Sequence, residues 1–180
     1  MAADDQANLE AAHPDLHRAA ARRFASGVTV AAARFGGRTH AIAATAFCSL
    51  SLEPPMVLLA VNHSGQLVEL AGQAGHVGIS ILGEDQRDIS EWAASSGRVP
   101  GAELPVATEP ARTGAPIISG CIAWFDCAVG SIDRYGDHVV IIGRVIDAWA
   151  AEQARPLLYF DGRYHALGEP LGKRSEPLGG

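Results

Sequence analysis

The fold is decided by the stretch GVTVAAARFGGRTHAIAATAF, residues 27–47. Two short runs of β-branched and small apolar residues, 27–33 and 39–47, lie on either side of Gly36-Gly37. A pair of glycines between two such runs is typical of the turn of a β-hairpin, because glycine readily adopts the positive φ angles that tight turns require. The spacing therefore predicts an antiparallel hairpin in the first third of the chain.

A helix is predicted before this hairpin and an extended segment after it. Pro14 suits the first turn of a helix, and this helix is expected to run to about Ala25. Arg18 and Arg22 would share its exposed face. Residues 49–55 (SLSLEPP) are expected to be extended, since the residue before a proline is pushed out of the helical region.

The rest of the chain reads as strands and short helices. The apolar run 56–61 (MVLLAV) has the length of a strand and is expected to be buried on both faces. Residues 97–116 are rich in Gly and Pro and are expected to be irregular, and residues 133–137 supply a turn. The remaining predicted helices are 66–74 and 84–95, and the remaining predicted strands are 77–82, 121–129, 138–148, 157–160 and 163–167.

This order of elements favours a mainly β fold. About seven strands with three short helices do not alternate regularly enough for a doubly wound α/β sheet. A closed antiparallel β-barrel with peripheral helices fits better, because closure removes exposed strand edges. A chain of 180 residues has the size of one domain, expected over residues 13–168. Residues 1–12 and 169–180, by their Gly, Pro and charge content, are expected to be flexible termini.

Composition excludes several classes of function. The chain carries 14 Lys and Arg against 20 Asp and Glu, a net charge of −6, which argues against binding to nucleic acid or to an anionic membrane. No apolar run is long enough to cross a bilayer, and the first twelve residues do not read as a secretion signal. The three cysteines form no CxxC motif, so free thiols and a cytoplasmic location are expected.

Familiar catalytic motifs do not occur in the sequence. It has no glycine-rich dinucleotide fingerprint, no Walker A loop and no serine nucleophile elbow. His13 and His17 have a spacing that would suit a metal on one face of a helix. Because Pro14 leaves His13 outside the predicted helix, we expect no metal site.

Four stretches in a fixed order point to a family. They are FASGVTV (24–30), ATAFCSLSLEPP (44–55), GDHVVIIG (136–143) and PLLYFDGRY (156–164). In this order and spacing the sequence resembles the short-chain flavin reductases, the reductase components of two-component flavin-dependent monooxygenases, over about residues 16–168.

The resemblance implies a fold and an activity. It implies an FMN-binding split barrel, antiparallel and Greek-key-like, that forms a homodimer. It also implies that the protein binds FMN or FAD, transfers a hydride to the flavin from NADH or NADPH, and supplies the reduced flavin to a separate monooxygenase.

The resemblance also assigns residues to the flavin. The segment 44–47 matches the family's flavin loop, where small side chains let the backbone approach the ring, although Ala43 and Ala46 stand where hydroxyl residues are common. Residues 62–64 lie between a strand and a helix start, where N–H groups and the helix dipole can hold a phosphate. The residues assigned to flavin are Ala44, Thr45, Ala46, Phe47, Ser49, Asn62, His63 and Ser64.

Each of these assignments has a purely structural alternative. The small residues of segment 44–47 could serve strand packing alone. Ser49 could cap the turn that follows it, and Ser64 could be a helix N-cap.

The nicotinamide nucleotide is assigned to His138 and Tyr164. His138 matches the family's GDH motif at a strand start, where a histidine on its own is more often structural, and Tyr164 matches an aromatic C-terminal stretch. No catalytic side chain is nominated, since hydride transfer between two cofactors requires neither a general acid nor a general base.

Two other functions remain open on the sequence. One is a non-catalytic flavin-binding carrier or sensor with the same barrel, and the other is a related barrel enzyme that oxidises a phosphorylated vitamin. His138 and Tyr164 favour the reductase, because a carrier needs no nicotinamide pocket.

Overall fold

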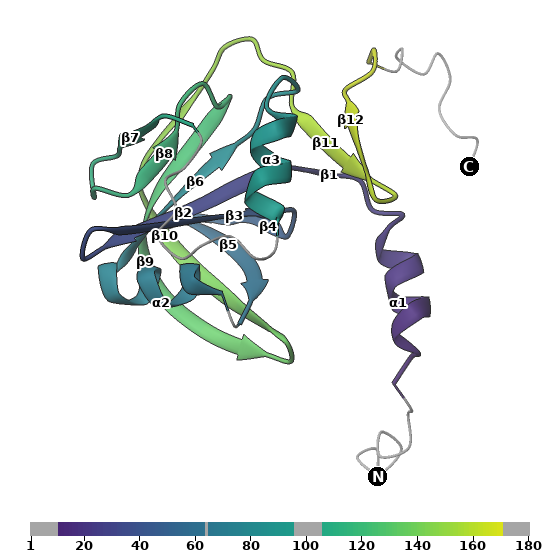
Figure 1. Ribbon diagram of the computed structural model, residues 1–180, viewed down its shortest axis with the longest axis horizontal. Coiled ribbons are helices and arrows are strands. Elements are labelled where there is room, and N and C mark those ends of the chain that lie inside the picture. The colour runs from purple at the N-terminus through teal and green to yellow at the C-terminus, as the bar shows by residue number, and fades with distance from the viewer. Residues whose placement is uncertain (1–10, 64, 96–105, 171–180) are drawn as a thin grey trace.

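A computed structural model describes residues 11–63, 65–95 and 106–170 of the chain. Its centre is an antiparallel sheet of seven strands in the order β3-β2-β6-β9-β10-β5-β4 (Figure 1). These strands are β2 (Thr29–Phe35), β3 (Arg38–Ala44), β4 (Phe47–Leu52), β5 (Pro55–Asn62), β6 (His76–Ile81), β9 (Ala123–Tyr135) and β10 (His138–Ala150). The mainly β, antiparallel prediction is confirmed.

The predicted N-terminal hairpin forms, but its second strand is shorter than expected. β2 and β3 pair antiparallel from Thr29 opposite Ala44 to Phe35 opposite Arg38. The predicted strand 39–47 breaks after Ala44, because the Ala46 carbonyl accepts a hydrogen bond from the Ala60 N–H of β5 at 2.9 Å. This contact comes from a distant part of the chain, so the local pattern does not contain it.

The seven-stranded sheet curves into a barrel that is open between β3 and β4. β3 and β4 are the two edges of the seven-stranded sheet, and within the described residues they do not pair with each other. Thr45 and Ala46 alone link the two edges. The arrangement is a barrel that is split between β3 and β4 rather than closed by a continuous ladder.

A second, three-stranded sheet lies beside the split barrel. It has the order β1-β11-β12, formed by β1 (Ser26–Gly27), β11 (Leu157–Phe160) and β12 (Arg163–Ala166), and Figure 1 shows helix α1 beyond it. Helix α1 spans Pro14–Ala21 with His13 outside it as the N-cap, and none of its residues is buried. The prediction that this helix reaches Ala25 is wrong, because the chain must extend before β1 can pair with β11.

Two apolar cores lie on the two faces of β2. Ala31 and Ala33 pack into the core beneath helix α2 (Gln66–Ala74), which the sequence predicts with the same bounds. Val30 and Ala32 pack into the core beneath helix α3 (Arg87–Ala94). The predicted helix 84–95 begins later than expected, because the Gln86 side chain accepts a hydrogen bond from the Gly83 N–H and so closes a turn before the helix.

Strand β5 is buried on one face only. Val57, Leu59 and Val61 are fully buried, whereas Met56, Leu58 and Ala60 between them are half-buried. The prediction of burial on both faces is therefore wrong, and the chain presents a second, partly covered apolar face.

Part of the segment predicted to be irregular forms a small hairpin. Strands β7 (Thr108–Pro110) and β8 (Pro116–Ile118) pair antiparallel, so the prediction is wrong there, and residues 97–105 lie outside the described residues. The fully buried carboxylate of Asp126 on β9 holds the hairpin loop, since it accepts hydrogen bonds from the Thr113 N–H at 2.7 Å and from the Thr113 hydroxyl at 2.5 Å. Such partners are what a buried carboxylate requires.

Within the described ranges, no helix is long and apolar enough to cross a membrane, and no group of three or more His, Cys, Asp or Glu could hold a metal ion. Of the predicted flexible termini, residues 1–10 and 171–180 lie outside the part of the chain that the structure describes.

Candidate functional site

Three cavities meet at the link between the two edge strands, and Thr45 lines all of them. We name each cavity after an element in its wall. The β5 cavity has a volume of about 650 Å³, the α1 cavity of about 510 Å³ and the α3 cavity of about 140 Å³.

The β5 cavity brings together residues from three predicted motifs. Its wall contains segment 44–46, Asn62 at the end of β5, and His138 at the start of β10. Asn62 and His138 are directly opposite each other in the antiparallel register of β5 and β10. Strand pairing thus places a predicted flavin residue beside the predicted nucleotide residue, although 75 residues separate them in the sequence.

The His138 ring is held by its neighbour in the chain. Its Nδ1 lies 2.8 Å from a carboxylate oxygen of Asp137, and its side chain is about half exposed. This hydrogen bond, together with the charge of His138, lowers the pKa of the Asp137 carboxyl below its ordinary value. With Nδ1 engaged, Nε2 is the ring nitrogen left to meet a ligand.

The start of helix α2 also lies at the β5 cavity. Gly65 is the N-cap and forms no side-chain cap, and both Gly65 and Gln66 line the cavity. Backbone N–H groups at a helix start and the positive end of the helix dipole favour an anion there. His63 is exposed and lines none of the three cavities, although its N–H donates to the Asp137 carbonyl at 3.2 Å. Ser64 lies outside the described residues.

Tyr164 lines the α3 cavity rather than the β5 cavity. The two cavities share Ala43, Ala44, Thr45 and Ala94, so Tyr164 faces the other side of the predicted flavin segment. Its hydroxyl lies 2.9 Å from the buried Ser90 hydroxyl of α3.

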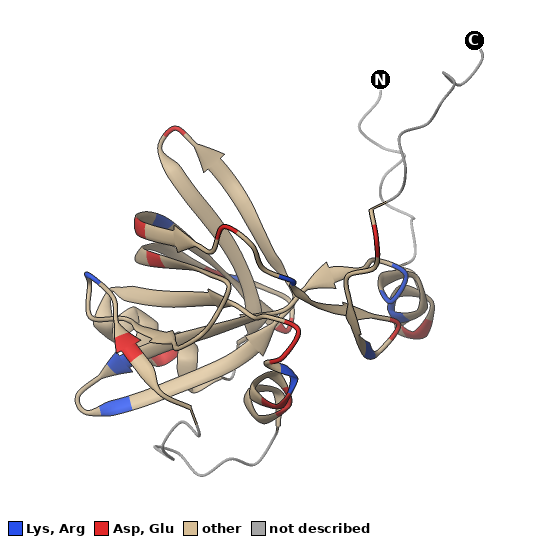
Figure 2. Ribbon diagram, turned by 90° about the horizontal axis from the view of Figure 1, so that it is seen from above, with Lys and Arg blue, Asp and Glu red and all other residues tan. Residues whose placement is uncertain are grey.

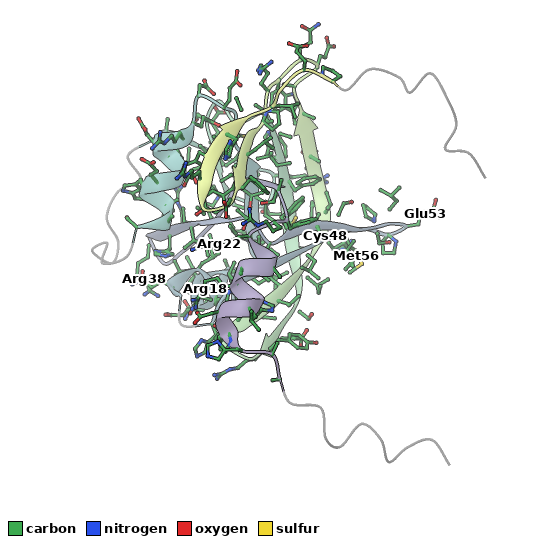
Figure 3. All side chains as sticks on the ribbon, turned by 90° about the vertical axis from the view of Figure 1, so that its right-hand side faces the viewer. Arg18, Arg22, Arg38, Cys48, Glu53 and Met56 are labelled. Carbon is green, nitrogen blue, oxygen red and sulfur yellow. The ribbon has the colours of Figure 1, made fainter. Side chains whose placement is uncertain are left out.

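The wall of the α1 cavity contains Phe47. The half-buried Phe47 ring lies 5.5 Å from Phe125, so it belongs to both the core and the cavity wall. Arg18 of α1 and Arg22, the C-cap that follows the helix, line this cavity, and both are exposed, as predicted for that face of the helix. Figure 3 labels Arg18 on α1, Arg22 just after the helix, and Cys48 on the β4–β5 hairpin.

Ser49 is not brought to these cavities. It is exposed on β4 and lines none of the three, so its assignment to flavin receives no geometric support.

Some cavity residues were missed by the sequence reading although a signal was present. His40 lines the β5 cavity, and it precedes Ile42 and Ala44 on β3 by two and four residues. Alternate residues of a strand share a face, so Ala44 could have identified His40. Ser90 carried no such signal, because its role depends on a contact with a strand 74 residues away.

The antiparallel barrel of this chain is open between its edge strands β3 and β4, and its fold is that of the split-barrel proteins. A family model for the flavin reductase like domain matches residues 21–168, and the chain belongs to this family.

Individual relatives agree with this assignment. The chain is 39% identical over 153 residues to the reductase component of 4-hydroxyphenylacetate 3-monooxygenase from Thermus thermophilus, covering 85% of this chain and 96% of that protein. It is 36% identical over 157 residues to the NADH-dependent flavin reductase StyB from Pseudomonas fluorescens, covering 86% and 89%. Among solved structures, the flavin reductase PheA2 superposes with a TM-score of 0.79 at 34% identity, covering 88% of this chain and all of that one.

Proposed function

We propose that this chain transfers a hydride from NADH or NADPH to FMN or FAD and supplies the reduced flavin to a separate monooxygenase. The observation that carries the proposal is the β5 cavity, whose wall unites segment 44–46, Asn62 and His138. The relatives named as reductase components of monooxygenases and as NADH-dependent flavin reductases support it.

The residues around the cavity fit a flavin. Ala43, Ala44 and Ala46 leave room for a planar ring to approach the backbone of β3 and of the link, and a volume of about 650 Å³ is within the range of small-molecule sites. The start of α2, where Gly65 has no side chain to occupy the space, suits the phosphate. Asn62 would contribute a polar side chain between ring and phosphate.

The protein's own residues would position the reactants rather than react. Bound flavin and nicotinamide nucleotide together supply the redox chemistry, as hydride passes from one ring to the other. Asp137 fixes the His138 ring, so that Nε2 can hydrogen-bond to the nucleotide. Holding two rings in contact can contribute several kcal/mol of the reduction in the barrier.

The proposal includes a homodimer. Leu52 is 81% exposed and Leu50 is 47% exposed, and both lie on β4 beside the half-buried outer face of β5. Figure 3 shows the tip of this β4–β5 hairpin, at Glu53, extending away from the body of the protein. Exposed apolar faces of this kind are typical of interfaces. A second copy of the chain would cover the face and border the α1 cavity, which Cys48 and Leu58 line.

The proposed compartment is the cytoplasm. Cys48, Cys121 and Cys127 are all free thiols, which favours a reducing environment. Figure 2 shows acidic and basic residues on both α1 and α3 and near strand ends, rather than gathered on one face.

The test is the oxidation of NADH and of NADPH by purified protein under anaerobic conditions, with FMN, with FAD and with no flavin. We expect nucleotide oxidation that depends on flavin and produces reduced flavin in equal amounts. Flavin binding without turnover by either nucleotide would support the carrier or sensor instead. Absence of both binding and turnover would contradict the proposal.

A further inference from the structure

The buried hydroxyl of Ser90 on α3 forms a hydrogen bond with Tyr164, which lines the α3 cavity. Ser90 is 1% exposed, and its hydroxyl lies 2.9 Å from the Tyr164 hydroxyl, with either able to donate. A buried hydroxyl needs a hydrogen-bond partner, so each group satisfies the other. The bond joins α3 to β12 across a separation of 74 residues in the sequence.

The Tyr164 ring is held by two further contacts. Its centroid lies 5.3 Å from that of Tyr159 on β11, in an edge-to-face arrangement with an interplanar angle of 65°. The Arg87 guanidinium lies 5.7 Å from the same centroid, at a distance suited to a cation–π contact, and is itself held by Glu91 at 2.7 Å. These two contacts act on the ring itself, whereas the Ser90 bond holds its hydroxyl end.

One face of α3 makes these contacts and reaches the cavities. Arg87, Ser90 and Ala94 are spaced by three and four residues, so they share a face of the helix. Arg87 and Ser90 hold Tyr164, and Ala94 lines both the α3 and the β5 cavity. Across the narrow α3 cavity, Tyr164 faces Ala44 and Thr45. A displacement of the ring would change the width of this space directly.

We propose that Ser90 is a positioning residue that sets the affinity for the nicotinamide nucleotide by fixing the Tyr164 ring, without touching the nucleotide itself. This inference rests on the proposed function and on the prediction that Tyr164 contacts the nucleotide. Loss of the Ser90 hydroxyl frees the ring to turn, so the nucleotide must restrain it on binding. The loss should therefore weaken nucleotide binding more than it slows hydride transfer.

The test compares Ser90→Ala, Tyr164→Phe and the double variant. Each single variant should raise the KM for NADH, and its dissociation constant measured by NADH fluorescence, about threefold to tenfold, because one hydrogen bond is lost. The double variant should match the single variants rather than multiply their effects, since both remove the same bond. The dissociation constant of FMN should change less than that of NADH.

Ser131→Ala is the matched control. It also removes a serine hydroxyl bond, to Asp133 at 2.7 Å, but Ser131 lines none of the three cavities. Its KM for NADH should equal that of the wild type. The melting temperature of each variant shows whether weaker NADH binding comes from unfolding or from a displaced Tyr164 ring. If Ser90→Ala does not fold, Tyr164→Phe tests the same hydrogen bond.

Three outcomes would overturn the inference. One is an unchanged NADH dissociation constant in folded Ser90→Ala, and another is multiplicative effects in the double variant. The third is a wild-type protein that does not bind NADH, which would overturn the proposed function as well. A wild-type protein that binds NADH without reducing flavin would contradict only the proposed function, because the Ser90 effect on binding would still be measured.

Discussion

At the scale of single residues, Asp137 and His138 depend on each other. The bond between them lowers the pKa of Asp137, so the carboxylate stabilises the fold above the pKa it has in the unfolded chain, and this contribution is lost as the pH falls through the lower, folded value. In His138→Ala we expect the pKa of Asp137 to rise toward its ordinary value, as followed by NMR titration of the carboxyl carbon. His165→Ala is the control, and a pKa that stays low in His138→Ala would show that His138 is not the cause.

His138 also carries the second prediction at this scale. It lines the β5 cavity opposite Asn62, where we expect its Nε2 to meet the nucleotide. His138→Ala should raise the KM for NADH about tenfold, the effect of losing one hydrogen bond to a charged ligand. Initial rates at saturating flavin measure it, with His165→Ala again as control. An unchanged KM would remove His138 from the nucleotide site.

The three cysteines should differ in reactivity. Cys48 is exposed in the wall of the α1 cavity. Burial raises the pKa of Cys121, and burial, followed by the charge of Asp126, raises the pKa of Cys127 to about 12, so neither is a ready thiolate. A thiol reagent at neutral pH should therefore titrate one cysteine in the folded protein and three after unfolding. Cys48→Ser should abolish the fast reaction; a fast reaction that persists would contradict this assignment.

How much of the site could be predicted depends on how far apart in the sequence the contacting residues lie. The sequence identified the small residues of segment 44–46, Asn62 and His138 separately, through the family's motifs. That Asn62 meets His138 follows from the register of β5 on β10, which no local pattern contains. The same applies to Tyr164, whose position depends on Ser90 of a different element.

At the scale of elements, predictions succeeded where local pattern decides. The β2–β3 hairpin follows from its paired glycines, and α2 has its predicted bounds, ending at Gly75 with a φ of 72°. The break after Ala44 and the β7–β8 hairpin were missed, because each depends on partners distant in the chain: Ala60 for the break, and Asp126 for the hairpin loop.

The packing of β8 over β6 supports a prediction about a glycine. A Cβ atom added to Gly78 would collide with the Pro116 carbonyl oxygen and lie 2.8 Å from Ile117 Cδ1. Because backbone cannot give way as a side chain can, Gly78→Ala should lower the free energy of unfolding by about 1–3 kcal/mol, as measured by urea denaturation. Gly27→Ala, with nothing within 4 Å of the added atom, is the matched control. Equal stability of the two variants would contradict this close packing.

At the scale of the whole molecule, the exposed leucines of the β4–β5 face lead us to expect a dimer. We expect light scattering to give a mass twice the 18.8 kDa of one chain. Leu50→Asp should dissociate this dimer, because it would bury a charge in an apolar contact. Phe35→Asp is the control, since Phe35 is exposed to a similar extent, 44% against 47%, but lies at the tip of the β2–β3 hairpin. A Leu50→Asp variant that remains a dimer would place the interface elsewhere.

The link formed by Thr45 and Ala46 constrains how the sequence of such a protein can evolve. Thr45 borders all three cavities, and Ala46 borders two of them. Under the proposed function, a replacement in the link would therefore alter the surroundings of flavin and of nucleotide at once. Preferences for flavin and for nucleotide can diverge independently only through the outer walls, with α1 on one side and α3 on the other. Variation among descendants of this chain should accumulate there, while the two-residue link stays constant.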